Sequence, residues 1–120
     1  MTDLSRLLAE MQPVLHEEPY GFELLDPDAP LPEEVFALIR EEEGMTMIAP
    51  FPDGEWARIS LTVHSSLSAV GLSAALARAL ADHALPANIV AGFHHDHILV
   101  PWERRHQALQ ALTNLSEQHR

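Results

Sequence analysis

The order of the predicted elements after residue 55 constrains the fold more than any other feature of this sequence. Residues 56–63 alternate between apolar and polar side chains, which predicts a strand, and the Ala/Leu-rich segment 72–84 repeats leucine at helical spacing. Two more strands are expected at 87–93 and 97–100, and a final helix is expected after Pro101. This order predicts an α+β, ferredoxin-like fold, with helices on one face of a mainly antiparallel sheet.

The first half has a related but less regular pattern. We expect a short amphipathic helix capped by Asp3, a strand at 20–25, and a second strand at 45–49. Between these strands, three prolines in 26–32 predict an ordered loop. After the loop, Pro32 and the acids that follow it predict a helix that ends at Gly44, with Val35, Phe36 and Ile39 facing the core.

Composition excludes several kinds of chemistry. The 120 residues include no Cys and no Lys, which excludes thiolate catalysis, disulfides, iron–sulfur clusters, Schiff-base chemistry and the P-loop lysine. No segment approaches the roughly 18 apolar residues that a membrane helix needs. The N-terminal segment lacks the basic and apolar regions of a signal peptide. We therefore expect a cytoplasmic protein that is not embedded in a membrane.

Charge and histidine are unevenly distributed along the chain. Residues 1–60 contain 14 acidic groups and 3 Arg, whereas residues 61–120 contain 4 of each, and the formal net charge is −11. Such an acidic surface repels phosphate backbones, so we do not expect nucleic-acid binding. We expect two unlike halves, 1–55 and 56–120, packed as one compact unit.

The segment 61–101 resembles an ACT domain. It begins with a strand, continues through a loop in which Gly71 and Leu72 open a helix, and reaches Asn88 at the start of a second strand. Together with REEEGMT at 40–46, the motifs HSSLSAVGLSA and NIVAGFHHDHILVP are similar to small bacterial tandem-ACT proteins. The resemblance implies two ACT-like halves, of which the first is degenerate because its loop, DPDAPLP, has no glycine. The final strand of the second unit is missing from its usual place, and the resemblance implies that a neighbouring half lends it.

The resemblance implies a regulatory protein that binds a small metabolite, in particular an amino acid. Because the sequence has no nucleophile elbow, thiol or lysine, we expect no catalysis and no cofactor. The resemblance implies a homodimer as well as a regulated partner enzyme. A helix start also presents free backbone N–H groups that can hold a carboxylate, and Gly71 permits close approach. The implied ligand-binding residues are those of the loop, of the second strand and of the following acidic position: Ser65, Ser66, Ala69, Val70, Gly71, Leu72, Asn88, Ile89, Val90 and Asp96.

Each of these residues also has a structural interpretation. The serines can cap the helix, Gly71 can permit helix packing, and Asn88 and Asp96 can stabilise turns. The alternative function is therefore a dimerisation or protein-interaction module without a small-molecule ligand.

The histidines supply candidates for a metal site, although the signal is weak. His95 and His97 are alternate residues of a predicted strand, and with His64 they would provide three nitrogen ligands of the kind that zinc accepts. The alternative is that they are turn and edge residues. We predict no metal, and His64 and Ser65 face opposite ways on an extended strand, which argues against a catalytic pair.

Overall fold

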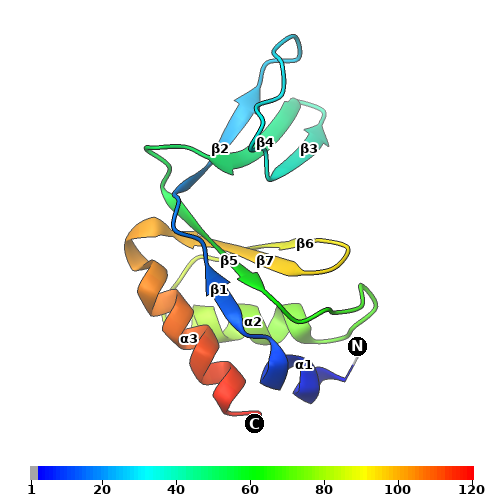
Figure 1. Ribbon diagram of the computed structural model, residues 1–120, viewed down its shortest axis with the longest axis vertical. Coiled ribbons are helices and arrows are strands. Elements are labelled where there is room, and N and C mark those ends of the chain that lie inside the picture. The colour runs from blue at the N-terminus through cyan, green and yellow to red at the C-terminus, as the bar shows by residue number, and fades with distance from the viewer. Residues whose placement is uncertain (1–2) are drawn as a thin grey trace.

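The computed structural model describes residues 3–120. Its elements, in chain order, are α1 (Leu4–Glu10), β1 (Pro13–Leu15), β2 (Tyr20–Leu25), β3 (Ala37–Glu41), β4 (Gly44–Pro50), β5 (Trp56–Leu61), α2 (Leu72–Ala81), β6 (Asn88–Ala91), β7 (Asp96–Pro101), the 3₁₀ turn η1 (Trp102–Arg104) and α3 (Arg105–Glu117). Figure 1 shows β2, β3 and β4 at one end of an elongated molecule, and the three helices at the other end. No helix among residues 3–120 has the length and apolar character to cross a membrane.

The strands form one antiparallel sheet in the order β3–β4–β2–β5–β7–β6. The two halves join where Tyr20 of β2 pairs with Trp56 of β5. On the same side of β5, β1 adds a further strand, with Val14 opposite Ser60. The first half thus supplies the second with a strand beside β5, where a neighbouring half was expected to contribute one.

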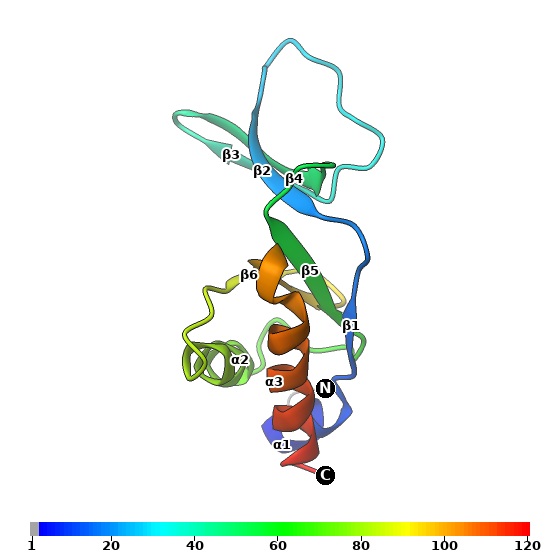
Figure 2. The same cartoon turned by 90° about the vertical axis from the view of Figure 1, so that its left-hand side faces the viewer.

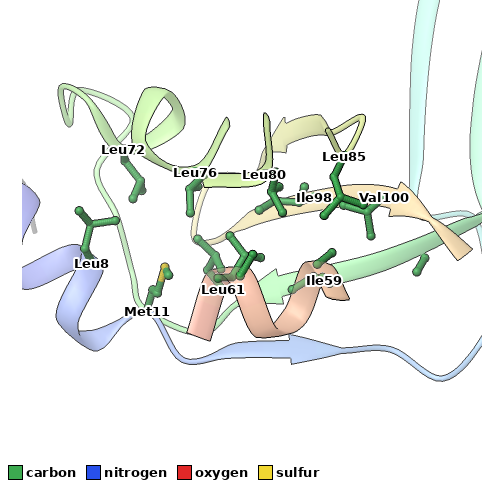
Figure 3. Packing of buried hydrophobic residues seen from close by; sticks show 14 of the residues in the cluster. Leu8, Met11, Ile59, Leu61, Leu72, Leu76, Leu80, Leu85, Ile98 and Val100 are labelled. Carbon is green, nitrogen blue, oxygen red and sulfur yellow. The ribbon is translucent and has the colours of Figure 1, made fainter. Parts of the chain in front are cut away.

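The three helices pack on one face of the part of the sheet formed by β1, β5 and β7, as predicted (Figure 2). Leucines 72, 76 and 80 recur every four residues along α2, so they form one stripe, and all three are buried. Figure 3 shows Leu80 of this stripe beside Ile98 of β7, whereas Leu72 lies above Leu8 of α1 and Met11, the residue that follows α1. Each fully buried leucine contributes about 2 kcal/mol through removal of its surface from water.

The prediction of a helix between Pro32 and Gly44 is wrong. Residues 37–41 instead form β3, which pairs with β4 in a hairpin whose turn is Glu42 and Glu43. Pairing satisfies the outer backbone groups of β4, which a helix would leave exposed at the edge of the sheet. The three apolar residues expected on the helix provide too small a stripe: Ile39 is exposed, and Phe36 packs against a second core.

This second core lies on the face of the sheet opposite the helices. Tyr20, Ile48 and Leu99 are its buried members, and side chains from both halves, among them Phe36 and Trp56, pack around them. Because these residues come from β2 and β4 of the first half and β7 of the second, this core packs the two halves against each other.

Candidate functional site

The predicted ligand loop connects β5 to α2, and Gly71 is the N-cap of α2. Gly71 has φ +95°, a left-handed conformation, and it provides no side chain to cap the helix. The first turn of α2 contains no acidic residue. The first N–H groups of this ten-residue helix therefore remain available to an anion, together with the positive end of the helix dipole.

The structural need for glycine at this position is directly testable. A Cβ at position 71 would lie 3.1 Å from Cδ2 of Leu4, and an L-residue is strained at this φ. We expect Gly71→Ala to reduce the free energy of unfolding by about 1 kcal/mol. Urea denaturation checks this, with Ser73→Ala at an exposed position of the same helix as a control that should change stability by less than about 0.5 kcal/mol. An unchanged midpoint in Gly71→Ala would show that the loop relaxes freely.

The structure brings Ser65 and Asp96 together. The Ser65 hydroxyl donates to Oδ2 of Asp96 at 2.8 Å, and Asp96 is only 8% exposed. In residues 3–120 no other side-chain hydrogen bond reaches this carboxylate, and the one ion pair there, Arg6–Glu10, lies in α1. Asp96 is thus a largely buried carboxyl group whose one side-chain hydrogen-bond partner is a neutral hydroxyl.

The other predicted loop residues have different surroundings. Ser66 accepts a hydrogen bond from the Ser68 N–H at 3.0 Å, which stabilises the turn. Ala69 packs against the main core, and Leu72 is buried in it, so Leu72 can offer a ligand only its backbone. Val70, in contrast, is 84% exposed.

The predicted residues of β6 point to both faces of the sheet. Ile89 packs against the helix-side core, whereas Val90 packs against the second core. Asn88 is exposed and lies opposite Leu99 of β7. Because β6 ends the strand order, its outer backbone groups are open to another chain.

The three candidate histidines, His64, His95 and His97, do not converge on one point. The rings of His64 and His95 lie 4.6 Å apart in an edge-to-face pair, and His95 Nδ1 lies 3.3 Å from the Val63 carbonyl oxygen. His97 instead contacts Ser60 and Arg58 of β5. Within the part of the chain that the structure describes, no group of three or more His, Asp or Glu side chains is placed to hold a metal ion.

One polar cluster was missed by sequence reasoning: Arg58, with Tyr20, His97, Ser60 and His16, on the face opposite the helices. Arg58 donates to the Tyr20 hydroxyl at 3.0 Å, and its guanidinium carbon lies 3.9 Å from the centre of the Phe36 ring. Ser60 Oγ lies 2.8 Å from both His97 Nδ1 and His16 Nε2. The alternation of Trp56, Arg58 and Ser60 along β5 placed Arg58 on this face, but the sequence did not indicate its partners.

Burial and the nearby Arg58 charge shape the titration of this cluster. Burial, then the charge of Arg58, lowers the pKa of His97 to about 4, and Asp96 opposes the shift only in part. The pKa of His16 is lowered by the same two causes. Both imidazoles are therefore neutral near pH 7, which allows His97 Nδ1 to accept from Arg58 Nη2 at 3.3 Å.

Comparisons with known proteins agree with this geometry. One family model, described as ACT domain, matches residues 1–65, and a second with the same description matches residues 54–114. The chain belongs to the ACT domain family. No curated protein matches it in sequence.

Solved structures include related proteins. VC0802 from Vibrio cholerae, a protein of unknown function described as a possible transport protein, is 39% identical, with a TM-score of 0.74 over 90% of this chain and 92% of its own. The ligand-free regulatory subunit of aspartate kinase from Thermus thermophilus is 16% identical, with a TM-score of 0.67 over 88% of this chain and 97% of its own. A protein from Agrobacterium tumefaciens is 17% identical, with a TM-score of 0.66 over 82% and 84%. At these low identities, the last two show the fold alone.

The two ACT halves are unequal. The second has both of its helices and receives β1 from the first, whereas in the first half the loop between β2 and β3 replaces the helix. The glycine-containing loop occurs in the second half, so a ligand site of the ACT kind is expected there.

Proposed function

We propose that this ACT protein is a non-catalytic, cytoplasmic sensor that binds an amino acid at the loop 65–72 and Asp96. The proposed site has two poles of opposite charge. The open N-terminus of α2 suits the carboxylate of the ligand, and Asp96 suits its ammonium or guanidinium group.

The observation that carries this proposal is the environment of Asp96. A buried carboxylate is costly unless a cation or several hydrogen bonds compensate it. Within residues 3–120, the Ser65 hydroxyl is the one side chain that hydrogen-bonds to Asp96, and no cation pairs with it. Among the described residues, the fully enclosed side-chain polar atom without a hydrogen-bond partner is Arg58 Nε, so the Asp96 oxygen that Ser65 leaves unpaired is accessible to a cationic ligand group.

We further propose that a second copy of the chain completes the site. The loop 65–72 lies beside β6, whose outer edge pairs with no other strand among residues 3–120, so a second copy could cover both. Phe93, at the tip of the β6–β7 hairpin, is 79% exposed. In the loop, the side chains of Leu67 and Val70 are also largely exposed. Figure 1 shows this hairpin and this loop at the same end of the molecule. Exposed apolar groups beside the open edge of β6 favour a homodimer there.

The regulated partner is proposed to be an enzyme of the pathway that makes or uses the ligand. The Thermus thermophilus structure is a regulatory subunit of aspartate kinase, which supports a regulatory role for this fold without naming the partner of this chain.

We also propose that the two halves divide near residue 55, into segments 1–55 and 56–120.

Asp96→Asn tests the ligand site. We expect wild-type protein to bind at least one of the twenty amino acids in isothermal titration, and Asp96→Asn to weaken that binding at least about tenfold, because the amide removes a buried charge partner. Asp82→Asn is the matched control, since Asp82 is exposed beyond the C-terminal end of α2 and loses the same charge. Equal affinities in the two variants would reject the role of Asp96.

The alternative function, a dimerisation module without a ligand, predicts a different result. The same exposed apolar residues, Leu67, Val70 and Phe93, favour it. A thermal-shift screen separates the two, because a ligand at 100 times its dissociation constant adds about 2.7 kcal/mol to stability. A flat screen against all amino acids, with a dimer in light scattering, would support the module and reject the sensor.

A further inference from the structure

A hollow of about 490 Å³ lies at the other end of β5 from the ligand loop. It is formed by the turn before β5, the end of β7, η1 and the loop before β6, and it is lined by Gly54, Glu55, Trp56, Pro86, Pro101, Trp102, Glu103 and Arg104. Figure 1 places this region where β5 leaves the β2–β4–β3 part of the sheet, beside the start of α3. Its volume is in the range of small-molecule sites.

The aromatic walls of the hollow are held in place by neighbours outside it. The Trp56 ring packs edge-to-face on Phe22, with centroids 5.6 Å apart. The Arg105 guanidinium lies 3.8 Å from the centre of the Trp102 ring, and Arg105 is not part of the lining. The backbone N–H of Trp102 donates to the Glu55 carbonyl oxygen at 2.8 Å, which connects the two sides of the hollow. Two positioned indoles are therefore presented from different segments of the chain.

The charge at the rim is negative. Glu55 and Glu103 are exposed, and neither forms an ion pair within residues 3–120. The cation of the lining, Arg104, is committed elsewhere: it donates to the carbonyl oxygens of His83 and Ala84 at 2.8 and 3.0 Å, and to Gln107 Oε1 at 3.0 Å. The groups that remain free to meet a ligand are two carboxylates, the Trp56 ring, the face of Trp102 that Arg105 leaves open, and two prolines.

We propose that this hollow binds a small organic cation with an apolar periphery, of the alkylammonium class. Indole faces attract such cations through their quadrupole, and carboxylates at the rim add attraction and select against anions. A neutral ligand of the same shape gains only the apolar contact. The site is separate from the loop at Gly71, so the proposal does not depend on the proposed sensor function. Glu55 and Trp56 lie where the chain passes from the first half to the second. A ligand bound there would therefore restrict movement of the two halves relative to each other.

Intrinsic fluorescence provides a direct test, because both tryptophans of the chain line the hollow. The probes are tetramethylammonium and choline, and the control ligand is 3,3-dimethylbutan-1-ol, a neutral molecule with nearly the shape of choline. We expect a saturable change in tryptophan fluorescence with both cations, and at least about tenfold weaker binding of the alcohol.

Variants at the rim complete the test. Glu55→Gln with Glu103→Gln should weaken cation binding about three- to tenfold, as expected for two partly exposed charges. Glu42→Gln with Glu43→Gln, at the exposed turn of the β3–β4 hairpin, makes the same charge change far from the hollow and should bind like wild type. Asp96→Asn should also bind like wild type, which distinguishes this site from the proposed amino-acid site. The proposal is overturned if the cations leave the fluorescence unchanged, if the alcohol binds equally well, or if the two double variants bind alike.

Discussion

Gly54→Ala is expected to destabilise the protein by about 3 kcal/mol, near the upper end of the range for substitutions that overpack a site. A Cβ at position 54 would overlap the Tyr20 carbonyl oxygen and lie 2.5 Å from the carbonyl carbon. These are backbone atoms of β2, which cannot rotate away as the end of a side chain can. The Gly54 N–H also donates to the Phe51 carbonyl at 3.0 Å, within the turn that leads from the first half to β5. The turn must therefore open, or β2 must shift from its position beside β5.

Urea denaturation followed by circular dichroism measures this effect. Asp53→Ala is the matched control, because Asp53 is exposed in the same turn and its replacement should change stability by less than about 0.5 kcal/mol. A similar, small loss in both variants would mean that the backbone at Gly54 has room that the structure does not show. A third variant, Gly21→Ala, is expected to be milder, since its Cβ would meet the flexible end of the Phe51 side chain.

Periodicity identified the elements that have one clearly apolar face. The leucine stripe of α2 and the alternation in β5 both follow from burial against the main core, so the sequence predicts them. The segment 37–41 was misassigned because its residues are largely exposed, and its conformation follows from pairing with β4. Its Ala, Leu, Arg and Glu residues have good helix propensity, but propensity is a weak term when a neighbouring strand needs a partner.

The candidate site was predictable as a set of residues but not as a set of contacts. The resemblance selected Ser65 and Asp96, which lie 31 positions apart, and the structure adds that they share a hydrogen bond. The Arg58 cluster was hidden because its members lie on β2 and β5, near β1 and on β7, and the register of strand pairing, which places Ser60 opposite His97, is what brings them together. Alternation along a strand shows which face of the sheet a polar residue lies on, but it does not show which residues of other strands contact that side chain.

His97 makes stability depend on pH. Its pKa is about 4 in the folded protein and near 6.5 in an unfolded chain, so the unfolded chain binds the proton more tightly. The stabilising contribution is complete above about pH 6.5 and decreases as the pH falls from there toward 4. Protonation at Nδ1 would bring two cations together, because Arg58 Nη2 lies 3.3 Å away, and would also oppose the Ser60 hydroxyl proton. Solvent screens part of this repulsion at a half-buried site, so we expect a total loss of about 2 kcal/mol.

The window from about pH 7.5 to 5 isolates this effect, since exposed carboxylates remain mostly ionised there. We expect the free energy of unfolding to fall continuously across it in wild-type protein. In His97→Gln the slope should be smaller, because the amide oxygen accepts from Arg58 without titrating, and the remaining slope would come from His16, whose pKa burial and Arg58 also lower. His106→Gln, at an exposed position of α3, is the control and should keep the wild-type slope. Identical slopes in the two variants would show that protonation of His97 is not what weakens the fold, and that the Arg58 cluster tolerates a charged imidazole.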